Sequence, residues 1–204
     1  MRRAKLNELD PATTVDKEDK ILLGAMQEFL AHGYVATSMD RVAAAAGVSK
    51  ATVYSYFKDK EGLFNALMSR LAQERIMDIE LQLEPPELAL RQLAETLIKK
   101  MESDHQFLGF LRLVVGESGR FPELAQMFIR NFAQIVIERL TSYLASRPEL
   151  NLPDPEATAR IFQGAILYFI VTQELLHGKE IIPIHRDRIV DGLMHLILGS
   201  KNHG

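Results

Sequence analysis

Apolar residues recur every three or four positions along almost the whole chain, and no stretch of strict alternation is long enough to indicate a β-strand. This spacing places apolar side chains on one face of a helix. The sequence therefore predicts an all-α fold. Pro85-Pro86 interrupts the helical pattern, because proline lacks the N–H and clashes with the preceding turn. We expect two domains on either side of this pair, residues 15–75 and residues 85–204.

Local signals set the bounds of the predicted helices. Gly33 and Gly47 can take the left-handed conformation that ends a helix, and a capping box at Thr37–Asp40, Ser49 and Asp59 can each begin one. The predicted helices cover about residues 16–31, 37–46, 49–57, 59–83, 87–103, 105–118, 122–146, 155–177 and 186–198.

Composition excludes several kinds of site. Without Cys the chain has no disulfide framework and no thiol ligand or nucleophile. It has no His-Glu-x-x-His pair and no glycine-rich phosphate loop, and Gly116-Glu-Ser-Gly119 departs from Gly-x-Ser-x-Gly. We expect no catalytic residue, no metal site and no cofactor. No apolar segment follows the basic N-terminus, and the densest apolar run, residues 161–171, is too short to span a bilayer. We expect a cytoplasmic protein without a membrane partner.

Residues 38–57 read as a short helix, a turn of Gly47-Val48-Ser49 and a second short helix, which is helix-turn-helix organisation. In the second helix, Val53 and Phe57 are spaced to pack inward. The opposite face then carries short side chains and donors, as a helix in the major groove requires. These residues are Lys50, Ala51, Tyr54 and Ser55. Over residues 41–60 there are four basic residues and one acidic residue, which suits contact with phosphate.

The same region resembles the DNA-binding domain of TetR/AcrR-type regulators over about residues 15–75. The motifs are Gly33-Tyr34, Thr37-Ser38-Met39, Ala46-Gly47-Val48-Ser49-Lys50, Val53-Tyr54-Ser55-Tyr56-Phe57 and Lys58-Asp59-Lys60-Glu61-Gly62-Leu63-Phe64. The resemblance implies that Lys50, Ala51 and Ser55 meet bases. It implies that phosphates are met by Thr37, Thr52, Tyr54, Tyr56 and Lys60. Ser38 joins these candidate DNA-contacting residues.

Several of these positions have a second interpretation. Tyr56 can be a half-buried aromatic residue, and Lys60 can be a solvated charge. A lysine at a helix N-terminus opposes the helix dipole, however, which favours an external anion. Arg2, Arg3 and Lys5 form either a disordered tail or an arm in the minor groove.

The resemblance further implies a homodimer, a ligand cavity in the C-terminal domain and no enzymatic activity. Residues 110–124 also resemble the C-terminal domain of AefR-like regulators. The last two predicted helices each carry two apolar stripes, which indicates burial against their own domain and against a second copy; a helix at the centre of one domain is the alternative. The predicted interface comprises Ile161, Ala165, Tyr168, Phe169, Thr172, Leu193, Met194 and Ile197.

Phenylalanines with a few polar neighbours, which lie between the two predicted domains, suggest a small-molecule cavity, with plain core packing as the alternative. The candidate ligand-binding residues are Phe107, Phe110, Arg112, Phe128, Asn131, Phe132 and Gln163. The leading hypothesis is a dimeric repressor that binds double-stranded operator DNA and is released by a largely apolar effector. A helical protein interaction module without DNA binding is the main alternative, and an all-α enzyme is the third.

Overall fold

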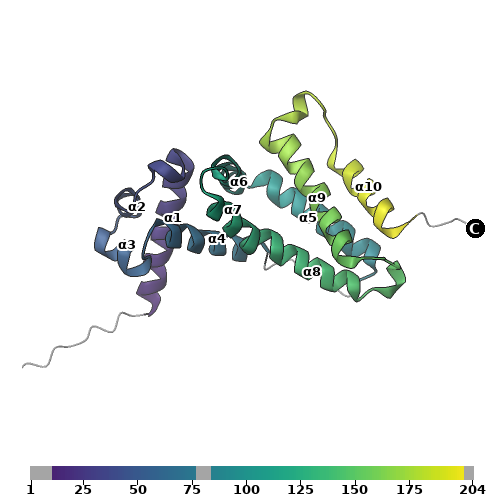
Figure 1. The fold of residues 1–204 in the computed structure, drawn as a ribbon, viewed down its shortest axis with the longest axis horizontal. Helices are drawn as coiled ribbons and strands as arrows, with labels where there is room; N and C mark the ends of the chain where they lie inside the picture. The colour runs from purple at the N-terminus through teal and green to yellow at the C-terminus, as the bar shows by residue number, and fades with distance from the viewer. Residues whose placement is uncertain (1–10, 77–83, 200–204) are drawn as a thin grey trace, which may run out of the picture. The chain divides into compact units, whose positions relative to one another are not determined.

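The computed structural model describes residues 11–76 and 84–199, and every regular element in these two ranges is helical (Figure 1). The prediction of an all-α fold is therefore confirmed. The proposed minor-groove arm and the end of the fourth predicted helix, residues 77–83, lie outside the described residues. None of the helices within the described ranges is long and apolar enough to cross a membrane.

The chain divides into two compact units, residues 1–70 and 71–204. The division falls inside α4 (Lys60–Ile76), earlier in the chain than the Pro85-Pro86 boundary expected from sequence. The reason lies in the last turns of α4. Arg75 forms an ion pair with Asp104, which joins these turns to the second unit.

In the first unit, α1 (Pro11–Ala36), α2 (Met39–Ala46), α3 (Lys50–Tyr56) and the start of α4 enclose a small core. Rings of Phe29, Tyr34 and Phe64 lie 5.3–5.7 Å apart at its centre. Helices α1 and α2 approach closely at Gly24, where an added Cβ would lie 2.8 Å from the backbone nitrogen of Ala46. This close approach explains why small residues are needed on both helices.

The predicted helix ends are largely observed. Gly33 breaks the helical backbone inside α1 with φ 77°, and Gly47 ends α2 with φ 65°. Ser49 caps α3 by accepting a 3.1 Å hydrogen bond from the Thr52 N–H, and Asp59 accepts one of 2.8 Å from the Gly62 N–H. The predicted capping box is wrong by one residue.

The residue that caps α2 is Ser38, whose hydroxyl accepts a hydrogen bond from the Arg41 N–H. Thr37 cannot take this role, because its side chain points back to α1.

The second unit contains α5 (Pro86–Ser103), α6 (His105–Glu117), α7 (Pro122–Phe128), α8 (Gln134–Ala145), α9 (Pro155–Ile170) and α10 (Arg186–Leu198). Helices α8 and α9 pack along each other, and α10 packs on α5 and α9 (Figure 1). The predicted helix 122–146 is interrupted by a π-helical turn at Ile129–Ala133, and the predicted helix 155–177 ends in another at Val171–Leu175.

Candidate nucleic-acid interface and ligand cavity

Helix α3 presents the outward face that the sequence predicts. Val53 is fully buried and Phe57 is nearly so, and they anchor the helix to the core. Lys50, Ala51 and Ser55 are exposed, and the Tyr54 side chain keeps 46% of its surface accessible. A short helix with a buried apolar face and an outward face of small and polar residues can enter a major groove.

Lys50 already has a partner on α2. Its ammonium lies 2.7 and 3.0 Å from the two carboxylate oxygens of Asp40, and 5.9 Å from the centre of the Tyr54 ring. The hydrogen bond and charge of Asp40 raise the pKa of Lys50, so the side chain is cationic at neutral pH. The side chains of Lys50 and Asp40 are both exposed, so their ion pair is weak and DNA phosphate or bases can compete for the lysine.

The candidate DNA-contacting residues with hydroxyl groups form hydrogen bonds within the helix-turn-helix. The Thr52 hydroxyl is hydrogen-bonded to that of Ser49 at 2.8 Å, and the Ser55 hydroxyl donates to the Thr52 carbonyl at 2.6 Å. Ser38 caps α2, and Tyr56 is half-buried with its ring 6.3 Å from that of Phe57. Ser38, Thr52 and Ser55 thus form local hydrogen bonds, and their contact with DNA stays a prediction.

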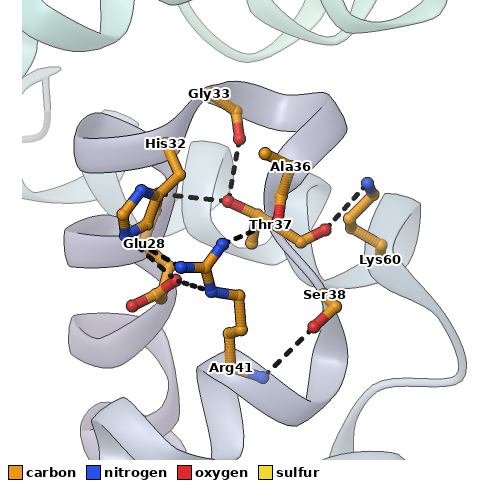
Figure 2. Close-up of polar contacts among 8 residues, drawn as sticks. All are labelled: Glu28, His32, Gly33, Ala36, Thr37, Ser38, Arg41 and Lys60. Atoms are coloured by element: carbon orange, nitrogen blue, oxygen red, sulfur yellow. Dashed lines mark hydrogen bonds and ion pairs between the residues drawn. The ribbon is translucent and has the colours of Figure 1, made fainter.

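Thr37 and Lys60 both bind the end of α1 (Figure 2). Thr37 is 2% exposed, and its hydroxyl donates a shared hydrogen bond to the carbonyls of Gly33 (2.8 Å) and Glu28 (3.1 Å). The Lys60 ammonium donates to the carbonyls of Tyr34 (2.7 Å) and Thr37 (3.0 Å) and lies 4.4 Å from the centre of the Tyr34 ring.

The carbonyls bound by Lys60 lie at the end of α1 after the break at Gly33 and, for Thr37, just beyond the helix. Carbonyl oxygens are neutral acceptors with partial negative charge, and they give the Lys60 ammonium hydrogen-bond partners within the protein. Contact of Thr37 and Lys60 with phosphate remains a prediction. For Thr37 such a contact would have to come from the main chain, because the side chain is buried.

Arg41 was not predicted as a functional residue, yet it joins α2 to α1 (Figure 2). Its guanidinium donates to the Ala36 carbonyl at 3.3 Å, lies 3.4 Å from a Glu28 carboxylate oxygen and 3.5 Å from the His32 ring. Arg41, Thr37 and Lys60 together hold the turn between α1 and α2 from three directions. The contacts of Thr37 and Arg41 span four to nine or more residues and those of Lys60 span 23 to 26, so no single short motif indicates the whole arrangement.

The second unit contains a partly open cavity of about 310 Å³. Four of the predicted ligand-binding residues line it: Phe107, Phe128, Phe132 and Gln163. The three phenylalanine rings lie 5.1–6.3 Å from one another and form an aromatic wall. Size and apolar lining are those of a small-molecule site.

The other three candidates lie outside this lining, because their side chains are engaged elsewhere. Phe110 is 2% exposed and packs in the core. Arg112 donates to the carbonyls of Glu174 and Leu175, and Asn131 donates to the Met127 carbonyl one turn back.

Four charged residues that sequence reasoning missed do line the cavity. They are Arg75, Lys100, Asp104 and Arg160. A signal for two of them exists in the sequence, because Lys100 and Asp104 continue the face of α5 that carries Leu97 and Met101.

The predicted dimer interface divides into two sets. Phe169, Leu193, Met194 and Ile197 are 2–6% exposed and belong to the core of their own unit, which corrects their assignment to a surface. Ile161 and Tyr168 are 59% and 65% exposed, and Ala165 and Thr172 are half-buried. Leu196, which was not predicted, is 75% exposed on α10.

Among the described residues, no cluster of three or more His, Asp or Glu side chains has the arrangement of a metal site.

Comparison with known proteins finds a family match in each of the two units. Residues 21–67 match the family model described as bacterial regulatory proteins, tetR family, and residues 88–199 match the C-terminal domain of AefR-like transcriptional repressors. YhgD of Bacillus subtilis, an uncharacterized HTH-type transcriptional regulator, is 27% identical over 90% of this chain and 95% of its own. The transcriptional activator FasR of Mycolicibacterium smegmatis is 29% identical over 92% and 84%.

Among solved structures, the flavonoid-responsive regulator FrrA superposes with a TM-score of 0.74 at 29% identity, over 89% of this chain and 95% of FrrA. The second family match alone covers more than half of the chain. The chain therefore belongs to the TetR family and is a helix-turn-helix transcriptional regulator with an AefR-like C-terminal domain.

Proposed function

We propose that this regulator is a homodimeric repressor that binds a pseudo-palindromic operator through α3 and leaves it when a small, largely apolar ligand enters the cavity. The observation that carries the proposal is the exposed face of α3, with Lys50, Ala51, Tyr54 and Ser55 outward over the buried Val53. Such a face gives base edges access to short side chains. Operator DNA lies in the bacterial cytoplasm, where we propose that the regulator acts.

A second copy of the chain is the proposed partner of the outer face of α9 and α10. Ile161 and Tyr168 lie two turns apart on one face of α9, and Leu196 is exposed on α10. Large apolar side chains exposed on two neighbouring helices favour an interface. One helix-turn-helix buries too little DNA for useful specificity, and a two-fold dimer doubles the readout.

Helix α4 is the proposed link between ligand and DNA. It begins with Lys60, which binds the turn before α2, and its far end carries Arg75, which lines the cavity. A ligand releases DNA if it favours a conformation in which the two α3 helices of the dimer no longer match the roughly 34–36 Å repeat of DNA. Equal α3 separations in crystals with and without a releasing ligand, and equal hydrogen exchange in α4, would contradict this link.

A DNA-binding measurement separates this proposal from the alternative of a protein interaction module. We expect fluorescence anisotropy to show binding to a duplex taken from beside the regulator's own gene, with an affinity that falls steeply as salt rises. Ala51→Glu should abolish binding by placing a carboxylate on the α3 face, whereas Gln27→Glu adds the same charge on α1 and should not. Equal affinity for that duplex and a scrambled one would reject the proposal.

A reporter gene behind the same DNA tests the direction of regulation. Deletion of the regulator should raise expression of the reporter. Since the similar protein FasR is an activator, a fall in expression would reject the repressor role while leaving DNA binding in place.

A further inference from the structure

The charged side chains that line the cavity of the second unit are engaged within the protein. Among the described residues they are Arg75, Lys100, Asp104 and Arg160. Lys100 interacts with another group of the protein, and the other three form ion pairs. Apart from Gln163, the rest of the described lining is apolar. The lining therefore offers a ligand apolar surface and one uncharged polar side chain.

Arg75 and Asp104 form the less exposed of these ion pairs. One Asp104 oxygen accepts a 2.9 Å hydrogen bond from the Phe107 N–H at the start of α6, and the other accepts one from Arg75. Burial raises the pKa of this carboxyl, but these hydrogen bonds and the charge of Arg75 outweigh burial and hold the pKa below its usual value. A charged ligand that paired with either residue would leave the other without its partner, which is costly.

Arg160 lies at the rim of the cavity. Its guanidinium is 2.6 Å from an oxygen of Glu156, one turn earlier on α9, and the two side chains are 61% and 57% exposed. Arg160 also lines a neighbouring hollow formed by residues of α8 and α9. Water and salt screen a charge at such a position, so this end of the lining selects weakly for a charged ligand.

Gln163 differs from the other polar residues of the described lining, because its side chain has no hydrogen-bond partner among the described residues. It is half-buried on α9, on the same face as Arg160 and Leu167, which also line the cavity. The side-chain amide of glutamine both donates and accepts hydrogen bonds. Beside apolar walls such a bond is stronger than in water, and leaving it unmade costs free energy.

We propose that the effector is uncharged, with an aromatic or aliphatic body against Phe107, Phe128 and Phe132 and one hydroxyl or carbonyl group that hydrogen-bonds to the side chain of Gln163. This inference rests on the proposed ligand-responsive function and names the class of the ligand and the residue that selects it. A charged group would lose hydration without gaining an unpaired opposite charge from the described lining, whereas a hydroxyl group gains Gln163.

Four probes with a naphthalene body test the class. At pH 7, 2-naphthalenemethanol is neutral and forms hydrogen bonds, 2-ethylnaphthalene is neutral and forms none, 2-naphthoate is an anion and 2-naphthylmethylamine is a cation. We expect fluorescence titration of the full-length protein to give at least about tenfold tighter binding for the alcohol than for either ion.

A substitution at Gln163 tests the residue. Gln163→Leu should lower the affinity of the alcohol relative to that of 2-ethylnaphthalene by about 3- to 10-fold, since it removes one hydrogen bond. A change in the shape of the cavity would alter the affinities of both neutral probes and leave their ratio nearly constant. Gln92→Leu is the matched control, at an exposed position of α5 outside the lining, and should keep the ratio of the unmodified protein.

Three outcomes would overturn the inference. Equal or tighter binding of the anion or the cation shows that the ligand is not selected as a neutral molecule, while ligand binding itself stands. An unchanged ratio in Gln163→Leu, with circular dichroism showing a folded variant, removes Gln163 from ligand selection. If the full-length protein binds its operator but none of the probes, the ligand class and the ligand-responsive part of the function both fail, and DNA binding stands.

Discussion

The two units of the molecule differ in how closely sequence determines which face of a helix points outward. In the first unit, α3 has one apolar face, and the residues expected outside are outside. In the second unit, α9 and α10 have two apolar stripes each, and four of the eight predicted interface residues are buried in their own core: Phe169, Leu193, Met194 and Ile197. A single apolar stripe has one way to be buried, whereas two stripes leave the choice open.

Helix α9 shows why the choice is open. Phe162 and Phe169 are buried, and Ile161 and Tyr168 are exposed, although both pairs are seven residues apart and consist of large side chains with mainly apolar surface. Periodicity places each pair on one face but gives no information on what covers that face. Packing against the other helices of the unit decides between them.

The largest expected effect comes from comparing a buried and an exposed position of the predicted interface in the second unit. Leu193→Glu places a carboxylate in a core position that is 3% exposed, and we expect a loss of about 3–5 kcal/mol in the free energy of unfolding. Tyr168→Glu alters an exposed position and should leave a folded monomer that no longer binds the operator. Thermal melts measure the stability of both variants, and sedimentation measures whether each is a monomer or a dimer. A stable monomeric Leu193→Glu variant would return that residue to the dimer interface.

Gly24→Ala tests the close contact of α1 with α2 in the first unit. The new Cβ would lie 2.8 Å from backbone that cannot rotate away, so the helices must separate, at a cost of about 1–3 kcal/mol. Gly116→Ala is the control in the second unit, because a Cβ there meets no atom of the described residues within 4 Å. We expect chemical denaturation to show a loss for the first variant and none for the second. Equal stability of the two variants would mean that the approach of α1 to α2 is not tight.

Lys60→Ala separates two roles of one side chain. Loss of its bonds to the Tyr34 and Thr37 carbonyls should cost about 1–3 kcal/mol of stability, and loss of the predicted phosphate contact should lower the slope of log affinity against log salt by about 1. Lys58→Ala, an exposed lysine before the same helix, is the control for lost charge. An unchanged slope in a folded Lys60→Ala variant would show that Lys60 does not contact phosphate and only holds the turn before α2.

Local signals in the sequence account for much of the fold. The all-α class, the glycine breaks at Gly33 and Gly47 and the caps at Ser49 and Asp59 follow from residue type and spacing, because each depends on atoms a few residues apart. The capping box failed because the Thr37 hydroxyl donates to the carbonyls of Gly33 and Glu28, four and nine residues back, and residue type alone does not decide between these carbonyls and the start of α2.

The candidate sites were less predictable than the helices. Phenylalanines indicated the aromatic wall of the cavity, whereas Arg75 lines it because of where α4 packs, and no short motif records that. The same holds for Lys60, whose carbonyl partners lie 23 to 26 residues away along the chain.

The most direct test that α3 reads operator sequence concerns Lys50, and its expected effect is no larger than those of Gly24 and Lys60. The affinities of the unmodified protein and of Lys50→Ala are measured on an operator and on every single base-pair substitution of one half-site, at one salt concentration. We predict that Lys50→Ala loses discrimination at one base pair, by about 1–3 kcal/mol, and keeps its preferences elsewhere. A uniform loss across all operators, with every preference retained, would contradict base readout by Lys50 and assign this lysine to phosphate.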